Sequence, residues 1–176
     1  VETRPLPALE HSVLSVVKKC QIPVQIFHSS ANLNFIMNSR IAALVASGTV
    51  ILTPLNVPQR IAIDGYNALL LSPDFWEAMI GRQKVLIFQH DSLCCTNSPF
   101  VASDFFKFDY VGAPWDRRRP VGLIIDGGNG GFSLRDWGKS VECLARFSPA
   151  EWPAGEDGFF AFHLDVMGAA VARMED

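Results

Sequence analysis

Two kinds of apolar pattern alternate along the chain. Short runs rich in β-branched residues have the length of β-strands, and longer segments between them repeat apolar residues at helical spacing. This alternation predicts a layered α/β fold with a mostly parallel central sheet. The strand-like runs are Val1–Pro5, Val24–Phe27, Val50–Leu52, Val85–Phe88, Tyr110–Gly112 and Val121–Ile125.

Four segments carry helical patterns. Apolar residues repeat at helical spacing from Leu9 to Cys20 and from Leu134 to Leu144. Pro73 directly after Ser72 is typical of a helix start, and a further helix is expected from about Gly155. The last residues, Arg173–Asp176, are also expected to be helical.

The run Val85–Phe88 is apolar throughout, which is typical of a strand buried on both faces at the centre of a parallel sheet. It is followed directly by Gln89, His90, Asp91 and Ser92. Ligands of open α/β sheets bind beyond the carboxyl ends of the strands, so these side chains are the first candidates for chemistry.

Composition and length limit the number of domains and the classes of partner that we expect. The 176 residues are 49 % hydrophobic and 19 % charged, which suits a single globular domain. Because the chain begins and ends within patterned segments, we expect residues 1–176 to be one domain that is cut at both ends. The formal net charge of −3 and the lack of a basic stripe argue against nucleic acid as a partner.

The sequence contains no apolar run long enough to span a membrane and no signal segment. The four cysteines, Cys20, Cys94, Cys95 and Cys143, lack metal-binding or disulfide-dense spacing, so reduced thiols are expected. Reduced thiols favour the cytoplasm, and a Golgi-type lumen remains open if an anchor precedes Val1.

Three polar clusters are candidate sites, and each has a plain structural alternative. Asp91 is suited to hold Mg²⁺ or Mn²⁺ against a diphosphate, or it caps a turn, whereas His90 is expected to be a partly buried structural residue. The glycine-rich stretch 127–131 allows a ligand to approach the backbone, or it is only a turn. Glu156 and Asp157 provide a general base, or they favour a helix start.

Two further features near these clusters remain open. The basic run 117–119 lies in a Pro-rich loop, and it is either solvated or screens a diphosphate. Trp115 and Trp152 either stack on a sugar or pack in the interior.

Four motifs in order resemble a family of glycosyltransferase-like domains catalogued as a domain of unknown function, over about residues 1–176. They are Val85–Ser92, Phe108–Trp115, Gly128–Arg135 and Glu156–Phe160. That family is similar in turn to sugar-nucleotide transferases of the GT-A fold, which are Rossmann-like and distantly similar to galactosyltransferase-like enzymes.

The resemblance implies roles for seven residues. Gln89 and Asp91 stand where those enzymes have Asp-x-Asp, so Asp91 is the implied metal ligand and Gln89 faces the nucleotide, although the first acid is replaced. Arg4, Gly130 and Gly131 are further implied donor-binding residues. The acidic pair implies Asp157 as the catalytic base, with Glu156 as the second choice.

The implied function is transfer of a sugar from a nucleoside-diphosphate sugar to a hydroxyl acceptor, assisted by Mn²⁺ or Mg²⁺. A histidine that commonly completes the metal shell has no clear counterpart, because His163 lies too close to the acidic pair. The main alternative is therefore an inactive module that binds a sugar nucleotide or glycan. A nucleotide hydrolase is a third possibility, and it would need another acid, such as Asp109 or Asp126, near Asp91.

Overall fold

The computed structural model describes residues 1–57, 60–116, 118 and 125–176. It shows a mixed α/β protein that divides into two compact units. The first unit comprises Val1–Ala62 and Gln89–Val101, and the second comprises Ile63–Phe88 and Ala102–Asp176. The expectation of a single domain stays a prediction.

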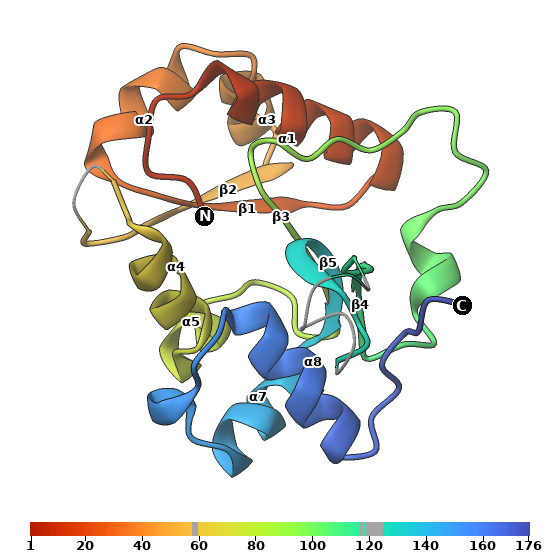
Figure 1. Cartoon of the computed structure of the whole chain (residues 1–176). Helices are drawn as coiled ribbons and strands as arrows, with labels where there is room; N and C mark the ends of the chain where they lie inside the picture. The colour runs from red at the N-terminus through yellow and green to blue at the C-terminus, as the bar shows by residue number, and fades with distance from the viewer. Residues whose placement is uncertain (58–59, 117, 119–124) are drawn as a thin grey trace. The chain divides into compact units, whose positions relative to one another are not determined.

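The first unit contains a pair of parallel strands, as the sequence predicts. Strand β1 (Val24–His28) pairs in parallel with β2 (Val50–Pro54), and Val24 lies opposite Val50. Helices α2 (Ser30–Met37) and α3 (Ile41–Ala46), which the pattern did not reveal, connect the two strands, and α3 packs on β2 and against α1 and α2 (Figure 1).

Helix α1 (Pro7–Cys20) confirms the amphipathic pattern. Pro7 begins the helix, where its missing N–H costs no hydrogen bond, and Gln21 ends it in the left-handed conformation with φ 54°. Its apolar face supplies Leu9, Val13 and Val16 to the core of the unit. The segment before it is not a strand, although the backbone N–H of Glu2 donates to Phe27 O of β1 at 3.0 Å.

The second unit corrects the expectation of a mostly parallel central sheet. Its three strands are β3 (Lys84–Phe88), β4 (Tyr110–Ala113) and β5 (Asn129–Asp136), in the order β3-β5-β4, and both pairings are antiparallel. In the described part of the chain β3 is therefore an edge strand of this sheet, and only Ile87 in it is buried. Uniform apolarity indicated a strand here, but it did not reveal the partner.

Strand β5 takes up the later part of the predicted glycine-rich turn, from Asn129 onward, and the helix start that the sequence suggested, whereas Gly127 and Gly128 remain in a turn. Leu134 lies opposite Leu86 of β3 and Val111 of β4, so it belongs to the sheet. The helix α7 begins only at Trp137 and runs to Arg146. Asp136 ends the strand and caps this helix by accepting a hydrogen bond from Lys139 N at 2.8 Å.

The second unit contains three further helices (Figure 1): α4 (Ile63–Leu70), α5 (Pro73–Glu77) and α8 (Glu156–Val166). Short 3₁₀ turns occupy Ala102–Phe105 and Pro149–Glu151. Helix α8 contacts β4, β5, α4 and α7, and it buries Phe159, Phe160 and Leu164. The predicted starts of α5 and α8 are confirmed.

The chain's last residues differ from the prediction. Arg173–Asp176 contain a turn rather than a helix, and Val171 forms an isolated parallel bridge with Tyr110. The predicted strand Val121–Ile125 lies outside the described residues except for Ile125, which is not in a strand. None of the helices in the described ranges has the length and apolar character needed to cross a membrane.

Candidate functional site

The start of helix α8 carries the acidic pair, and a buried ion pair anchors it to the sheet. Arg135 on β5 holds Glu156 with two hydrogen bonds, of 2.6 Å from Nη1 to Oε2 and 3.1 Å from Nη2 to Oε1. The Arg135 side chain is fully buried, and the Glu156 side chain is 4 % exposed. Glu156 is therefore held inside the second unit.

Aromatic rings surround the guanidinium of Arg135. Its Cζ lies 5.1 Å from the ring centre of Tyr110 and 5.2 Å from that of Phe160, at cation–π distances. Burial alone would lower the pKa of Arg135, but the charge of Glu156 and its hydrogen bonds outweigh burial and raise that pKa. Nε also donates to Ser133 Oγ at 3.0 Å, so each of the three guanidinium nitrogens donates a hydrogen bond.

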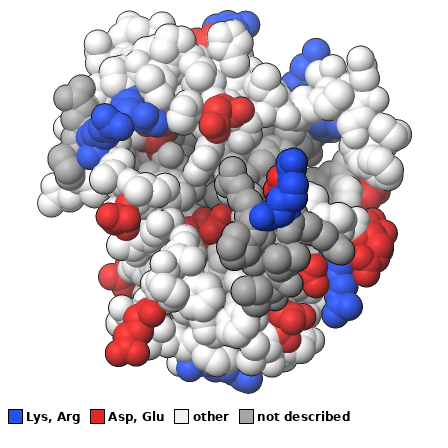
Figure 2. All heavy atoms as spheres, viewed as in Figure 1, with Lys and Arg blue, Asp and Glu red and all other residues white. Residues whose placement is uncertain are grey.

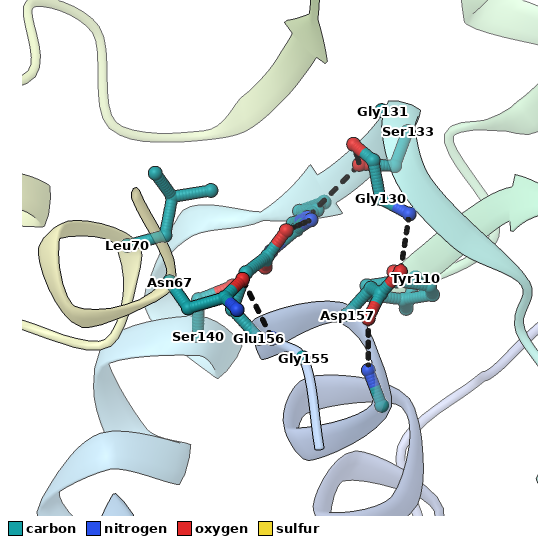
Figure 3. Close-up of polar contacts among 12 residues, drawn as sticks. Asn67, Leu70, Tyr110, Gly130, Gly131, Ser133, Ser140, Gly155, Glu156 and Asp157 are labelled. Atoms are coloured by element: carbon teal, nitrogen blue, oxygen red, sulfur yellow. Dashed lines mark hydrogen bonds and ion pairs between the residues drawn. The ribbon is translucent and has the colours of Figure 1, made fainter. Parts of the chain in front are cut away.

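Asp157, the neighbour of Glu156, is half-buried and points toward the glycine-rich start of β5 (Figure 3). Its Oδ2 accepts hydrogen bonds from Gly130 N at 3.2 Å and from Asn129 Nδ2 at 3.3 Å. Its Oδ1 accepts from Gly158 N at 2.8 Å. Three N–H donors thus fix this carboxylate, and no ion pair to it occurs among the described residues.

Glycine is required where β5 passes the acidic pair. A Cβ on Gly130 would lie 2.5 Å from both Arg135 Nη2 and Glu156 Oε1, closer than real Cβ contacts. The turn before it needs positive φ, 99° at Gly127 and 92° at Gly128, and Tyr110 Oη donates to Gly128 O at 3.0 Å. The glycine-rich stretch therefore allows a strand and its turn to approach α8 closely.

Gly131 is half-buried beside these residues. Its backbone N–H donates to Asn129 Oδ1 at 2.9 Å, so the same asparagine contacts both Gly131 and Asp157. The structure thus brings together four of the predicted site residues: Gly130, Gly131, Glu156 and Asp157.

The other predicted site residues, Arg4, Gln89 and Asp91, lie in the first unit. Arg4 donates from Nε to Glu2 Oε1 at 2.9 Å and from Nη2 to Glu2 Oε2 at 3.0 Å, and this hydrogen bonding raises the pKa of Arg4. The charge of Asp91 raises it further, although less. Asp91 is exposed, and Gln89 is half-buried at the start of a turn in which its carbonyl accepts from Ser92 N at 3.1 Å.

His90 completes this cluster in the first unit. Its Nδ1 lies 3.0 Å from Glu2 Oε2, and its backbone carbonyl accepts from Ser12 Oγ at 2.6 Å. Burial raises the pKa of Glu2, but the hydrogen bonds and charges of Arg4 and His90 together outweigh burial and lower it. The half-buried His90 therefore has structural partners.

The metal prediction gains no ligand set from this geometry. Among the residues that the structure describes, no three His, Cys, Asp or Glu side chains gather as a metal centre would require. Arg4 near Asp91 adds positive charge there. The role of Asp91 as a metal ligand therefore stays a prediction.

Sequence reasoning missed Glu2, Asn129 and Arg135, which organise the two clusters. Ser133 and Arg135 are two positions apart and therefore lie on the same face of β5. This pair of polar residues on one face is the one signal that could have suggested a buried polar face. Trp152 packs against Phe159 at 5.8 Å between ring centres and donates from Nε1 to Gly155 O at 3.0 Å, so its described contacts are internal.

Two members of the basic run, residues 117 and 119, lie outside the described residues. The remaining one, Arg118, is exposed and pairs with Asp116 at 2.6 Å. On the face in Figure 2, basic and acidic side chains are interspersed, and the described residues form no broad basic area there.

The fold and the acidic pair define a mixed α/β protein with a carboxylate set against a glycine-rich strand. The chain belongs to a family described as proteins of unknown function (DUF5672), whose model matches residues 54–176. The match begins at the last residue of β2 and includes the glycine-rich stretch 127–131 and the acidic pair Glu156 and Asp157. Comparison with curated proteins and with solved structures finds no match.

Proposed function

We propose that this chain is a glycosyltransferase that moves a sugar from a nucleoside-diphosphate sugar to a hydroxyl acceptor, on a GT-A-like, Rossmann-like fold. The observation that carries the proposal is the Asp157 carboxylate, half-buried at the start of α8 and oriented by three N–H donors. A fixed carboxylate of this kind is suited to remove the proton from an attacking hydroxyl.

Asp157 serves as the base in this proposal, and Glu156 positions it. A carboxylate has about four acceptor sites, and the donors to Asp157 occupy three of them. The remaining lone pair accepts the acceptor's proton. Glu156, in contrast, is buried and bound by Arg135 through both oxygens, so an acceptor hydroxyl has no access to it.

The donor-binding residues of the proposal in the second unit are Gly130 and Gly131, and the donor-binding roles of Arg4, Gln89 and Asp91 in the first unit stay predictions. Mn²⁺ or Mg²⁺ enters only as an ion that the donor's phosphate oxygens recruit beside Asp91, because these cations accept oxygen ligands and keep several from water or phosphate. The acceptor proton passes to Asp157, the acceptor oxygen bonds to the sugar carbon, and the nucleoside diphosphate leaves with the electron pair of the broken bond.

The first experiment is a thermal-shift screen of nucleoside-diphosphate sugars, with and without Mn²⁺. A donor that binds the folded chain raises the unfolding midpoint by mass action. If no donor shifts the midpoint, the transferase proposal is wrong. A donor that shifts it is then used to measure release of nucleoside diphosphate in the presence of candidate hydroxyl acceptors.

Asp157→Asn tests the base. We expect turnover to fall about 100-fold or more, since general bases contribute about 10²–10⁴-fold, while the thermal shift by donor persists. Asp165→Asn is the matched control, because Asp165 is an exposed acid on the same helix. Equal turnover of the two variants would remove Asp157 from the role of base.

The same measurements distinguish the transferase from the alternative proposal, a binding module without activity. It predicts a donor-dependent shift with no turnover by the unaltered chain. Asp91→Asn then tests the metal in calorimetric titrations of donor with and without Mn²⁺. If Mn²⁺ strengthens donor binding equally in both proteins, Asp91 does not contribute to binding the ion.

A further inference from the structure

Two cysteines far apart in the sequence lie side by side in the first unit. Cys20 ends α1 and Cys94 lies in the segment after β3, and their Sγ atoms are 3.8 Å apart. A disulfide has an S–S distance of about 2.05 Å, so a small movement of two side chains is enough to bond them. Both thiols are free and half-buried.

Helix α1 holds the segment that carries Cys94 in place. Ser15 Oγ accepts the backbone N–H of Cys94 at 2.7 Å and donates to the carbonyl of Cys94 at 3.3 Å. Lys19 Nζ donates to Ser98 O at 2.7 Å, and Ser12 Oγ donates to His90 O at 2.6 Å. The partners thus bracket Cys94 on both sides along the chain, which keeps its thiol near Cys20.

We propose that Cys20 and Cys94 form a reversible disulfide that fastens the segment after β3 to helix α1. When two reacting groups are held close together, each has a high effective concentration at the other. This favours reaction between Cys20 and Cys94 over reaction with other thiols. The neighbour Cys95 is exposed, and Cys143 is buried in the other unit. The fastened segment includes Gln89 and Asp91, yet the disulfide itself does not depend on the proposed function.

The reaction needs a low-molecular-weight disulfide as oxidant, such as oxidised glutathione. Burial, together with the neighbouring Cys20, raises the pKa of Cys94 to about 11, which keeps it a thiol at neutral pH. Because Cys94 stays protonated, we assign the first attack on the oxidant to Cys20, which gives up its proton, forms a mixed disulfide and releases one glutathione thiolate. Cys94 then gives up its proton and attacks the Cys20 sulfur, and the second glutathione leaves, so that two electrons reduce the oxidant to two thiols.

The test uses the full chain in glutathione redox buffer, followed by alkylation, digestion without reductant and mass spectrometry. We expect one cross-linked pair of peptides, joining Cys20 to Cys94, which dithiothreitol removes. The Cys20→Ser and Cys94→Ser variants lose it, and the matched control Cys95→Ser keeps it. Far-UV circular dichroism of each variant checks that the helices and strands are retained.

The unfolding midpoint gives a second readout. The bond would close a loop with a sequence separation of 74 residues. A disulfide that closes a loop of this size is expected to raise the unfolding midpoint by on the order of 10 °C. A Cys20–Cys95 or Cys94–Cys95 bond, a bond between chains only, or no cross-link in oxidising buffer would each overturn the proposal.

Discussion

The buried ion pair of the second unit allows a quantitative test by the substitution Glu156→Gln. The change keeps the shape of the side chain but removes the charge opposite Arg135, whose side chain is fully buried. Removing one partner of a buried ion pair typically costs about 3–5 kcal/mol, because the other charge is left without compensation. The amide oxygen of Gln still accepts one hydrogen bond, so we expect about 3 kcal/mol.

That loss is large enough to measure by two methods. In a protein of this size, about 1 kcal/mol shifts the thermal midpoint by about 2–4 °C, so the expected decrease is about 6–12 °C. Urea unfolding followed by circular dichroism should show a lower midpoint with an unchanged slope, because the surface exposed on unfolding stays the same. The two methods should agree on the sign and on the rough size of the loss.

Glu142→Gln is the matched control. Glu142 on α7 pairs with Lys139 at 3.0 Å and with Arg146 at 2.5 Å, but these groups are solvent-accessible. Exposed pairs contribute little, so the control should unfold close to the unaltered chain. If the Glu156→Gln and Glu142→Gln variants have the same unfolding midpoint, burial of the Arg135–Glu156 pair does not make its disruption more costly to stability.

A double variant separates the charge from the packing. Replacing both Arg135 and Glu156 by Met removes both buried charges and leaves apolar side chains against the rings of Tyr110 and Phe160. We expect the double variant to lose less unfolding free energy than the sum of the losses in the two single variants, because neither charge remains unpaired. Simple additivity would mean that the two side chains act independently.

Two further predictions concern neighbouring features. Gly130→Ala should lower the unfolding midpoint, because its Cβ would lie 2.5 Å from both partners of the buried ion pair, whereas Gly138→Ala in helix α7 should not, because its nearest contact is 3.4 Å. The pKa of Glu2 is lowered from 4.5 in the folded chain, so its ionised form stabilises the fold above that pH, and this stabilisation disappears as the pH falls through the folded value. Glu2→Gln should therefore flatten the acid side of a plot of stability against pH, and an unchanged acid slope would contradict the assignment.

Local patterns were sufficient to predict several elements. Helix α1 and strands β1 and β2 lie within one or two residues of where apolar spacing placed them. The start of α8 was also predicted, from glycine followed by two acids and an aromatic pair. Each of these signals is contained in a few adjacent residues, and the helix dipole or the burial of one face explains it without reference to distant parts of the chain.

Strand pairing could not be predicted in this way. Both β3 and β4 pair with β5, whose first residues are asparagine and two glycines and resemble a turn. Arg135 is acceptable in this buried strand only because Glu156 lies 21 residues further along and neutralises it. No local pattern contains that partner, so Leu134 was counted with the following helix instead of with the sheet.

The two members of the acidic pair show how a candidate site is divided by helix geometry. Successive residues on an α-helix are rotated by about 100°, so adjacent side chains leave the helix in different directions. Glu156 forms the ion pair with Arg135, whereas Asp157 is directed to the backbone of Gly130, as Figure 3 shows. The sequence could name both acids as candidates but could not rank them by burial. Because Glu156 is buried and each of its oxygens is bound by Arg135, the half-buried Asp157 is the more accessible acid of the pair, which is why we propose it as the base.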